Sequence, residues 1–231
     1  MIEFIFMLTH NDATVPNALE VLADVQDAGL RYIGFKDVGQ SPEVLTEIAA
    51  RSHDAGLEVM LEVVSTSAED ELRSVRAALD IGVDWVLGGT NPDEAGTILA
   101  GTDVGYCPFP GTIVGHPSVL QGAPEDIAAH AGELTARPGV HGVDLLAYRH
   151  PDTDPVALTR QVVEAASGPV IVAGSIVGAE QIQAVADAGA WGFTIGGAIF
   201  EERLPGAPSV REQIERVLAL DVVADGARAR G

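Results

Sequence analysis

Short runs of apolar residues recur along the chain, and stretches with the period of an amphipathic helix separate them. Each run is rich in Val, Ile, Leu and Phe and only a few residues long, which is typical of parallel strands buried on both faces. The pattern predicts eight strands, at residues 3–9, 31–37, 58–64, 84–89, 103–108, 140–148, 169–174 and 191–196.

The intervening stretches carry helix start and stop signals. A capping residue precedes a proline, which is favoured at the first helical position, at Ser41-Pro42, Asn91-Pro92 and Asp154-Pro155. A repeated Asp-x-Gly turn ends four of these stretches, and glycine there accepts the left-handed conformation that terminates a helix. These glycines are Gly29, Gly56, Gly82 and Gly189. The spacing of the first three is the length expected of one βα unit.

Eight βα units in succession predict an α/β protein with one domain, a closed (β/α)8 TIM barrel. We expect residues 1–220 to form the barrel and residues 221–231 to be a frayed tail. The competing doubly wound fold, with a bound dinucleotide, would need a glycine-rich turn after the first strand. That turn is Thr9-His10-Asn11-Asp12 and contains no glycine.

Composition excludes several classes of function. The net charge of −21 disfavours nucleic acid and anionic membrane surfaces as partners, because no basic patch is available to bind them. No apolar run approaches the ~18 residues of a membrane span, and the first apolar stretch lacks the basic region of a signal peptide. The single cysteine, Cys107, cannot form an internal disulfide, which fits a reducing cytoplasm.

Lys36 is the only lysine among the 13 lysine and arginine residues. It stands at the end of the second predicted strand, and burying an ammonium group costs several kcal/mol unless it is partnered. The carboxyl ends of the strands are also where the catalytic groups of a TIM barrel lie. The position of Lys36 therefore indicates a functional site.

Alternation along the strands assigns their faces. It turns Ile33 and Phe35 toward the helices and Lys36 into the barrel, and it turns Glu62 inward on the next strand at a similar height. A lysine and a carboxylate on adjacent strands can hold each other charged or exchange a proton during catalysis. The alternative is a buried ion pair that only fills the barrel.

The same alternation turns Asp144, Leu146 and Tyr148 inward on the sixth strand. Asp144 has either a structural hydrogen-bonding role or a role in the site. His10, at the end of the first strand, is a candidate acid or base, or alternatively a cap in the loop. Arg149 follows the sixth strand and could grip a phosphate or carboxylate, or form only a surface ion pair.

The last quarter of the chain contains two glycine turns after predicted strands, Gly174-Ser175 and Gly196-Gly197. Glycine lets backbone N–H groups approach an anion closely. Residues 168–200 resemble the phosphate-binding TIM barrels, most of all N-acetylmannosamine-6-phosphate 2-epimerase. The resemblance implies that Gly174, Ser175, Gly196 and Gly197 hold a phosphate, although tight packing alone would also explain the glycines. That family has an acid in the strand-seven turn where this chain has Ala173, so the epimerase reaction is not carried over.

An unusually long loop follows the fifth strand, and loops of this length are often lids or partner surfaces. No spacing of His, Asp or Glu resembles a zinc motif, so we expect neither a metal nor a cofactor. A metal held by Glu62, Asp144 and His10 across strands stays open.

These observations predict an enzyme for a small phosphorylated sugar or hydroxy-acid, working by isomerisation, epimerisation or decarboxylation through an enediolate-type intermediate. Lys36 would stabilise the oxyanion or donate a proton, Glu62 would be its acid–base partner, and Asp144 or His10 would be the second. One alternative is a Schiff-base aldolase that uses Lys36. Another is a non-catalytic regulator that binds a sugar phosphate. The sequence leaves homo-oligomerisation open.

Overall fold

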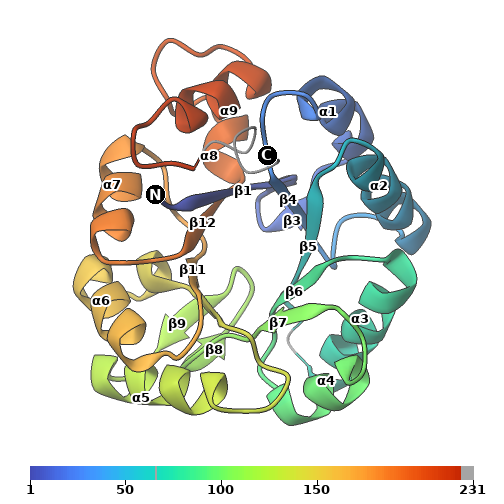
Figure 1. Ribbon diagram of the computed structural model, residues 1–231. Coiled ribbons are helices and arrows are strands. Elements are labelled where there is room, and N and C mark those ends of the chain that lie inside the picture. The colour runs from blue at the N-terminus through green and yellow to red at the C-terminus, as the bar shows by residue number, and fades with distance from the viewer. Residues whose placement is uncertain (66, 225–231) are drawn as a thin grey trace.

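The computed structural model describes residues 1–65 and 67–224. Within these residues, eight parallel strands form the barrel seen end-on in Figure 1. They are β1 (Glu3–Met7), β4 (Tyr32–Lys36), β5 (Glu58–Val63), β6 (Trp85–Gly88), β7 (Gly105–Cys107), β10 (Val143–Leu145), β11 (Val170–Val172) and β12 (Gly192–Ile195). Each lies within its predicted range, so the eight-strand prediction is confirmed.

The barrel closes between its shortest strands. The sheet runs in the order β10-β11-β12-β1-β4-β5-β6-β7. Between β7 and β10, the backbone N–H of His141 donates to Tyr106 O at 2.8 Å, and that of Asp144 donates to Pro108 O at 3.0 Å. These bonds join the two edges of the sheet, as the predicted single-domain (β/α)8 fold requires.

Helices surround the strands, and three of them begin at the prolines that the capping signals mark, Pro42, Pro92 and Pro155. The helices are α1 (Ala18–Val25), α2 (Pro42–Asp54), α3 (Ala68–Ile81), α4 (Pro92–Leu99), α5 (Pro124–Thr135), α6 (Pro155–Ala165), α7 (Ala179–Asp187), the short α8 (Gly197–Phe200) and α9 (Val210–Leu218). The Ser41 side chain accepts from Val44 N, and that of Asp154 accepts from Ala157 N. The glycines of the Asp-x-Gly turns all have positive φ, between 77° and 92°.

Two apolar layers follow from the alternation along the strands. Ile33, Phe35 and the other outward side chains pack against the helices in the main core. A separate apolar cluster fills the inside of the barrel and consists of Ile5, Met7, Tyr32, Met60, Leu87, Cys107 and Ile171. Lys36, Glu62 and Asp144 lie on the inner face, as predicted.

Three local expectations are corrected. The sixth strand, predicted to reach residue 148, ends at Leu145, because the chain turns into a 3-10 helix, η1 (Ala147–Arg149). The alternation of side chains therefore stops at Leu145. Leu146, which was predicted to face inward, packs in the main core against the helices. The first strand ends at Met7, so His10 belongs instead to a hairpin of β2 (Thr9–His10) and β3 (Ala13–Thr14).

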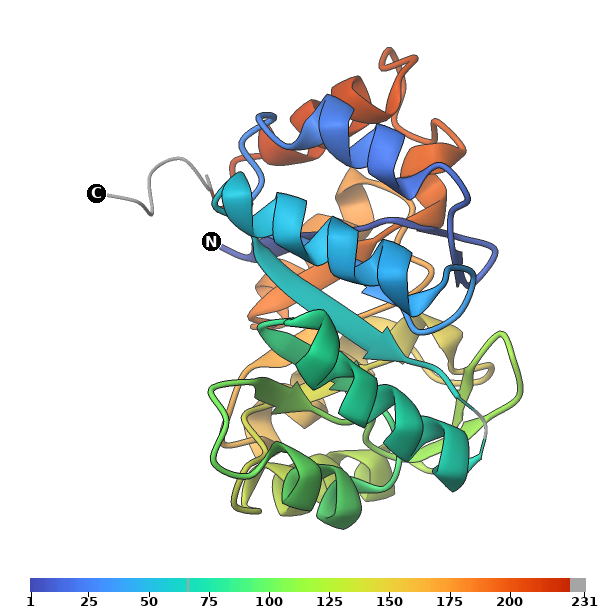
Figure 2. The same ribbon diagram turned by 90° about the vertical axis from the view of Figure 1, so that its right-hand side faces the viewer.

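The long segment after β7 is an ordered hairpin, with β8 (Thr112–Val114) and β9 (Val119–Gln121) paired antiparallel. Viewed from the side, this hairpin and the loops after β1 and β4 lie at one end of the barrel, while the N-terminus lies at the other (Figure 2). The strand ends that carry Lys36 and Glu62 therefore face a mouth formed by loops.

The C-terminal segment is described only as far as residue 224. Ile2 N donates to Val222 O at 2.7 Å, and Ala224 N donates to Ile2 O at 2.9 Å, so this segment pairs beside the start of β1. Residues 225–231 lie outside the described residues, and the frayed tail stays a prediction. No helix in the described part of the chain is both long and apolar enough to cross a bilayer.

Gly34 leaves no room for a side chain beneath the site. A Cβ at this position would collide with Met7 Sδ and lie 3.2 Å from the Met60 carbonyl oxygen. We expect Gly34→Ala to lower the free energy of unfolding by about 1–3 kcal/mol, through overpacking. Denaturant titration measures the change.

Gly96→Ala is the matched control, because Gly96 lies inside α4 and its nearest obstacle is Pro138 O at 4.0 Å. Replacing a helical glycine with alanine should raise the free energy of unfolding by roughly 0.5–1 kcal/mol. Equal effects of the two substitutions would contradict the packing described for Gly34.

Candidate active site

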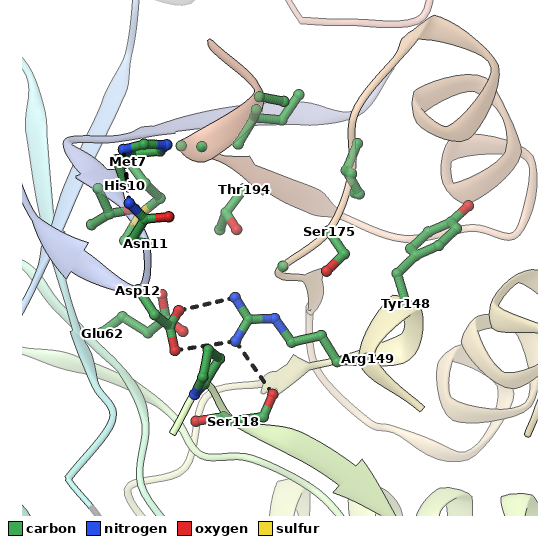
Figure 3. Close-up of a pocket in the computed structure, with 18 of the residues that line it drawn as sticks. Met7, His10, Asn11, Asp12, Glu62, Ser118, Tyr148, Arg149, Ser175 and Thr194 are labelled. Atoms are coloured by element: carbon green, nitrogen blue, oxygen red, sulfur yellow. Dashed lines mark hydrogen bonds and ion pairs between the residues drawn. The ribbon is translucent and has the colours of Figure 1, made fainter. Parts of the chain in front are cut away.

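A cavity of about 470 Å³ opens at the carboxyl ends of the strands. Its wall is built from the ends of β4, β5 and β12, the β2–β3 hairpin, the tip of the β8–β9 hairpin, η1 and the turn after β11 (Figure 3). The predicted site residues that line it are Lys36, Glu62, His10, Arg149, Gly174, Ser175, Gly196 and Gly197. Asp144, the remaining one, is buried in the interior.

Lys36 is the last residue of β4, and only 3% of it is exposed. Its ammonium group forms an ion pair with Asp12 and a second one with Glu62, at 3.4 Å. Glu62 is its register partner on β5. The backbone of Lys36 is also held, because its N–H donates to Thr14 Oγ1 and its carbonyl accepts from the same hydroxyl, both at 2.9 Å. Lys36 is thus fixed between two carboxylates.

Asp12 is a central residue of this site that sequence reasoning missed. Asn11 and Asp12 form the two-residue turn of the β2–β3 hairpin, with φ of 51° and 62°. This conformation suits Asn and Asp in a tight hairpin, and here it brings the Asp12 carboxylate to Lys36. The Asn-Asp pair, which is favoured in tight hairpin turns, was the available signal, but a two-residue strand is too short to show alternation.

The charges around Asp12 determine its protonation. Burial alone would raise the pKa of its carboxyl group. Hydrogen bonds and positive charge from Arg149 and Lys36 outweigh that effect and hold the pKa well below its usual range. His116, at the tip of the β8–β9 hairpin, places Nδ1 3.7 Å from Asp12 Oδ2. Asp12 is therefore a carboxylate at any ordinary pH.

Arg149 reaches into the site from η1, as Figure 3 shows. Its guanidinium donates to both Asp12 oxygens, at 2.9 and 3.3 Å, and to the carbonyl of Ser118 at 3.3 Å. The latter bond ties the β8–β9 hairpin to the barrel. Arg149 was predicted to bind a phosphate, and in this conformation its charge is directed to Asp12.

The two glycine turns occupy the wall that the sequence assigned to them. Gly174 and Ser175 both have positive φ, 75° and 60°, and a Cβ on Gly174 would collide with the Arg149 guanidinium. A Cβ on Gly196 would collide with the side chain and carbonyl of Thr9, so the backbones touch there. Gly197 is open, with only the edge of the His10 ring at 3.8 Å from a Cβ position. Close packing accounts for Gly174 and Gly196, while Gly197 presents its backbone to the cavity.

His10 lies at the rim. Its Nε2 is 3.3 Å from Glu201 Oε1, its Nδ1 is 3.3 Å from Asn11 Nδ2, and its ring packs near Phe200. These partners come from the β2–β3 turn and from the end of α8, and none of them is Lys36 or Glu62.

Asp144 lies in the interior and is 0% exposed. Neither carboxylate oxygen has a hydrogen-bond partner among the described residues. Burial raises the pKa of Asp144 well above its usual value, and the charge of Glu62 raises it further, while Lys36 and Arg149 partly oppose the shift. Asp144 is consequently favoured as a neutral acid.

The charge of the cavity is close to balanced. Among the described lining residues, Lys36 and Arg149 are the cations, and both contact Asp12. Glu62 and Glu201 add negative charge at the floor and the rim. Both cations of the cavity therefore already have a partner. Across the described part of the chain, no three His, Cys, Asp or Glu side chains are grouped to hold a metal, so Glu62, Asp144 and His10 do not form such a set.

Comparisons with known proteins support the fold. Neither a known protein family nor a curated protein matches this chain. Among solved structures, orotidine 5'-phosphate decarboxylase from Pyrococcus horikoshii OT3 is 16% identical, covers 93% of this chain and 96% of its own, and has a TM-score of 0.62. Orotidine 5'-monophosphate decarboxylase from Methanocaldococcus jannaschii, complexed with the inhibitor BMP, is 18% identical over 94% and 97% of the chains, with a TM-score of 0.65.

A mandelate oxidase mutant with an FMN adduct is 17% identical over 95% of this chain and 71% of its own, with a TM-score of 0.61. At these identities the likeness establishes the barrel fold alone. The fold expected from the resemblance to phosphate-binding TIM barrels is thereby confirmed.

Asp12→Asn tests the central ion pairs. Removing the carboxylate leaves the half-buried Arg149 without its counter-ion and the buried Lys36 with only Glu62, so we expect the free energy of unfolding at neutral pH to fall by about 3 kcal/mol. Because the folded pKa of Asp12 is lowered from 3.8, wild-type protein should also lose stability as the pH falls below that value, when the unfolded chain takes up the proton more readily. The variant should lack this acid-dependent contribution.

Denaturant titrations at several pH values measure both effects. Asp80→Asn, at an exposed position on α3, is the control and should change stability by less than about 0.5 kcal/mol. Equal stability of the Asp12 variant and the wild type would show that these ion pairs do not support the fold.

Proposed function

We propose that this chain is an enzyme that isomerises, epimerises or decarboxylates a small phosphorylated sugar or hydroxy-acid through an enediolate-type intermediate. The observation that carries the proposal is the buried Lys36 ammonium group, held between Asp12 and Glu62 in a cavity whose wall includes an open backbone at Gly197. A volume of about 470 Å³ suits a ligand of this size.

Lys36 supplies the electrophilic group. When a bond to the carbon beside a carbonyl breaks, negative charge develops on the carbonyl oxygen. A positioned ammonium group stabilises that charge more strongly in a dry site than in water. Asp12 and Glu62 fix the ammonium before the reaction, so little reorganisation is needed. In a decarboxylation, the same group delivers a proton to the carbon that has lost carbon dioxide.

Glu62 supplies the base. Its carboxylate lies beside Lys36 and lines the cavity, so it can take the proton from a carbon acid in an isomerisation or epimerisation. Its charge would also oppose a substrate carboxylate placed nearby, and loss of carbon dioxide relieves that repulsion. The fold likeness to two decarboxylases of a phosphate-bearing substrate supports this version of the reaction.

The phosphate would lie against Gly197 and the turn at Gly174 and Ser175. Since both lining cations contact Asp12, the backbone N–H groups carry the first contact, and Arg149 joins when the phosphate competes with Asp12 for its guanidinium. Arg149 also holds Ser118 O, so a phosphate that engages Arg149 changes the bond that ties down the β8–β9 hairpin.

The Schiff-base aldolase has less support. An amine nucleophile must approach a carbonyl carbon with a free lone pair, whereas the Lys36 amine is engaged by the carboxylates of Asp12 and Glu62.

A thermal-stabilisation screen with phosphorylated sugars and hydroxy-acids, each paired with its unphosphorylated form, tests the substrate class. A ligand at 100 times its dissociation constant adds roughly 2.7 kcal/mol. We expect only the phosphorylated members to stabilise the protein, and turnover of a stabilising compound should then be followed by release of carbon dioxide or exchange of its carbon-bound proton.

Lys36→Met tests the mechanism. Turnover should fall by roughly 10³-fold or more, because the group that stabilises the developing charge is lost, while phosphate-dependent stabilisation persists. Arg160→Met, at an exposed position on α6, is the control for loss of a cation and should leave turnover unchanged. Covalent trapping of substrate on Lys36 by borohydride would instead favour the aldolase, and binding without turnover of any screened compound would favour a regulator.

A further inference from the structure

Two carboxylates outside the cavity, one buried and one half-buried, hold the scaffold together. Glu71 on α3 is 1% exposed and accepts hydrogen bonds from Thr90 N, Asn91 N and Asn91 Nδ2, at 2.8 to 2.9 Å. Asp37, after β4, accepts from Val64 N, Ser65 Oγ and Ser74 Oγ, at 2.6 to 3.0 Å. Each of these carboxylates fixes a loop, and hydrogen-bond donors compensate its charge.

Asp144 differs from both. It is completely buried, and neither of its oxygens accepts a hydrogen bond from a described residue. An ionised carboxylate without donors is among the most costly groups to bury, whereas a neutral acid costs far less. An apolar side chain such as Leu would serve a scaffold role better, so we explain this acid by the proton it can hold rather than by hydrogen bonds.

The surroundings of Asp144 connect it to the reacting groups. Electrostatic interactions couple it to Glu62 on β5, Lys36 on β4 and Arg149 on η1. Cys107 on β7 is a further titratable neighbour, and burial raises the pKa of its thiol, with an added contribution from Asp144 when Asp144 is ionised. Of Glu62, Arg149 and Cys107, Glu62 is the one that lies beside the Lys36 ammonium group, at 3.4 Å. As a carboxylate, it can also accept a proton.

We propose that Asp144 is a buried proton store that recharges Lys36 through Glu62 after Lys36 has protonated the substrate. This inference rests on the proposed function for its catalytic consequence. It assigns Asp144 a positioning role, because Asp144 does not line the cavity and does not touch the substrate.

The proton transfers balance as follows. An N–H bond of Lys36 breaks and a C–H bond of the product forms, which leaves a neutral amine. Glu62 then takes a proton from Asp144, which breaks an O–H bond of Asp144, and passes that proton to the amine, which restores the N–H bond of Lys36. Asp144 is left as a carboxylate until solvent returns the proton after product release. Rotation of the Glu62 side chain, or one bridging water, completes the path, since the two carboxyl groups are not hydrogen-bonded in this conformation.

The protonation state can be measured without any substrate. Infrared spectra of protein labelled with 13C-aspartate should show, at neutral pH, the carbonyl band of one protonated carboxyl group that shifts with the label. Because the charge of Glu62 favours the protonated form, Glu62→Gln should move the titration of this band to lower pH. Glu47→Gln, on the exposed face of α2, is the control and should leave the titration unchanged. Absence of the band, or a band that Glu62→Gln does not move, would overturn the proposal.

Asp144→Asn gives the stability and kinetic readouts. A raised folded pKa contributes stability that is complete below the unfolded value of 3.8 and is lost as the pH rises toward the folded value. Wild-type protein should lose this contribution between those pH values, and the variant should not. With a compound that is turned over, kcat should fall by roughly 10²-fold while KM stays unchanged.

The two readouts separate the hypotheses. An unchanged kcat in Asp144→Asn would overturn the proton store even if the enzyme acts on a phosphorylated substrate. If no phosphorylated compound is turned over, the proposed function fails, while the infrared band still decides whether a proton is stored at Asp144.

Discussion

The mouth of this barrel depends on one carboxylate. Asp12 accepts from the ammonium group of Lys36 and the guanidinium of Arg149, and so it joins groups from the first, second and sixth βα units. Removing either cation from water without a counter-ion would cost free energy, and the Asp12 carboxylate offsets part of that cost for both. The arrangement therefore works only if the β2–β3 hairpin, β4 and η1 are in place together.

Backbone contacts make that arrangement rigid. Thr14 bonds to both backbone polar groups of Lys36, and Arg149 donates to the Ser118 carbonyl, so each hairpin is attached to a strand or turn of the barrel. Side chains held in this way lose little further entropy when a substrate binds. A site that stabilises charge by preorganised groups needs this property.

The acids around the site have three distinct roles. Asp12 is ionised and orders the cations, Glu62 lies beside the ammonium group and faces the cavity, and Asp144 is hidden and favoured in its neutral form. The differences come from the environment rather than from the residue type. Hydrogen bonds to the charged form lower the pKa of a carboxyl group, whereas burial raises it. The chain has a net charge of −21 and one lysine; among the described residues, Asp12 and Glu62 form ion pairs with that lysine, and Asp144 interacts with it electrostatically.

The sequence alone determined the barrel, the strand order along the chain and the inward faces of Lys36 and Glu62. These features follow from local rules: alternation in a strand has a period of two, and a helix ends at a glycine that accepts positive φ. Only the tertiary structure revealed Asp12, because its bonds to Arg149 span 137 residues and its hairpin strands are too short for a pattern. The tertiary structure also showed that neither oxygen of Asp144 accepts a hydrogen bond from the described residues. Whether a buried acid has a donor depends on all the side chains and backbone groups that the fold packs around it, and these come from separate parts of the chain.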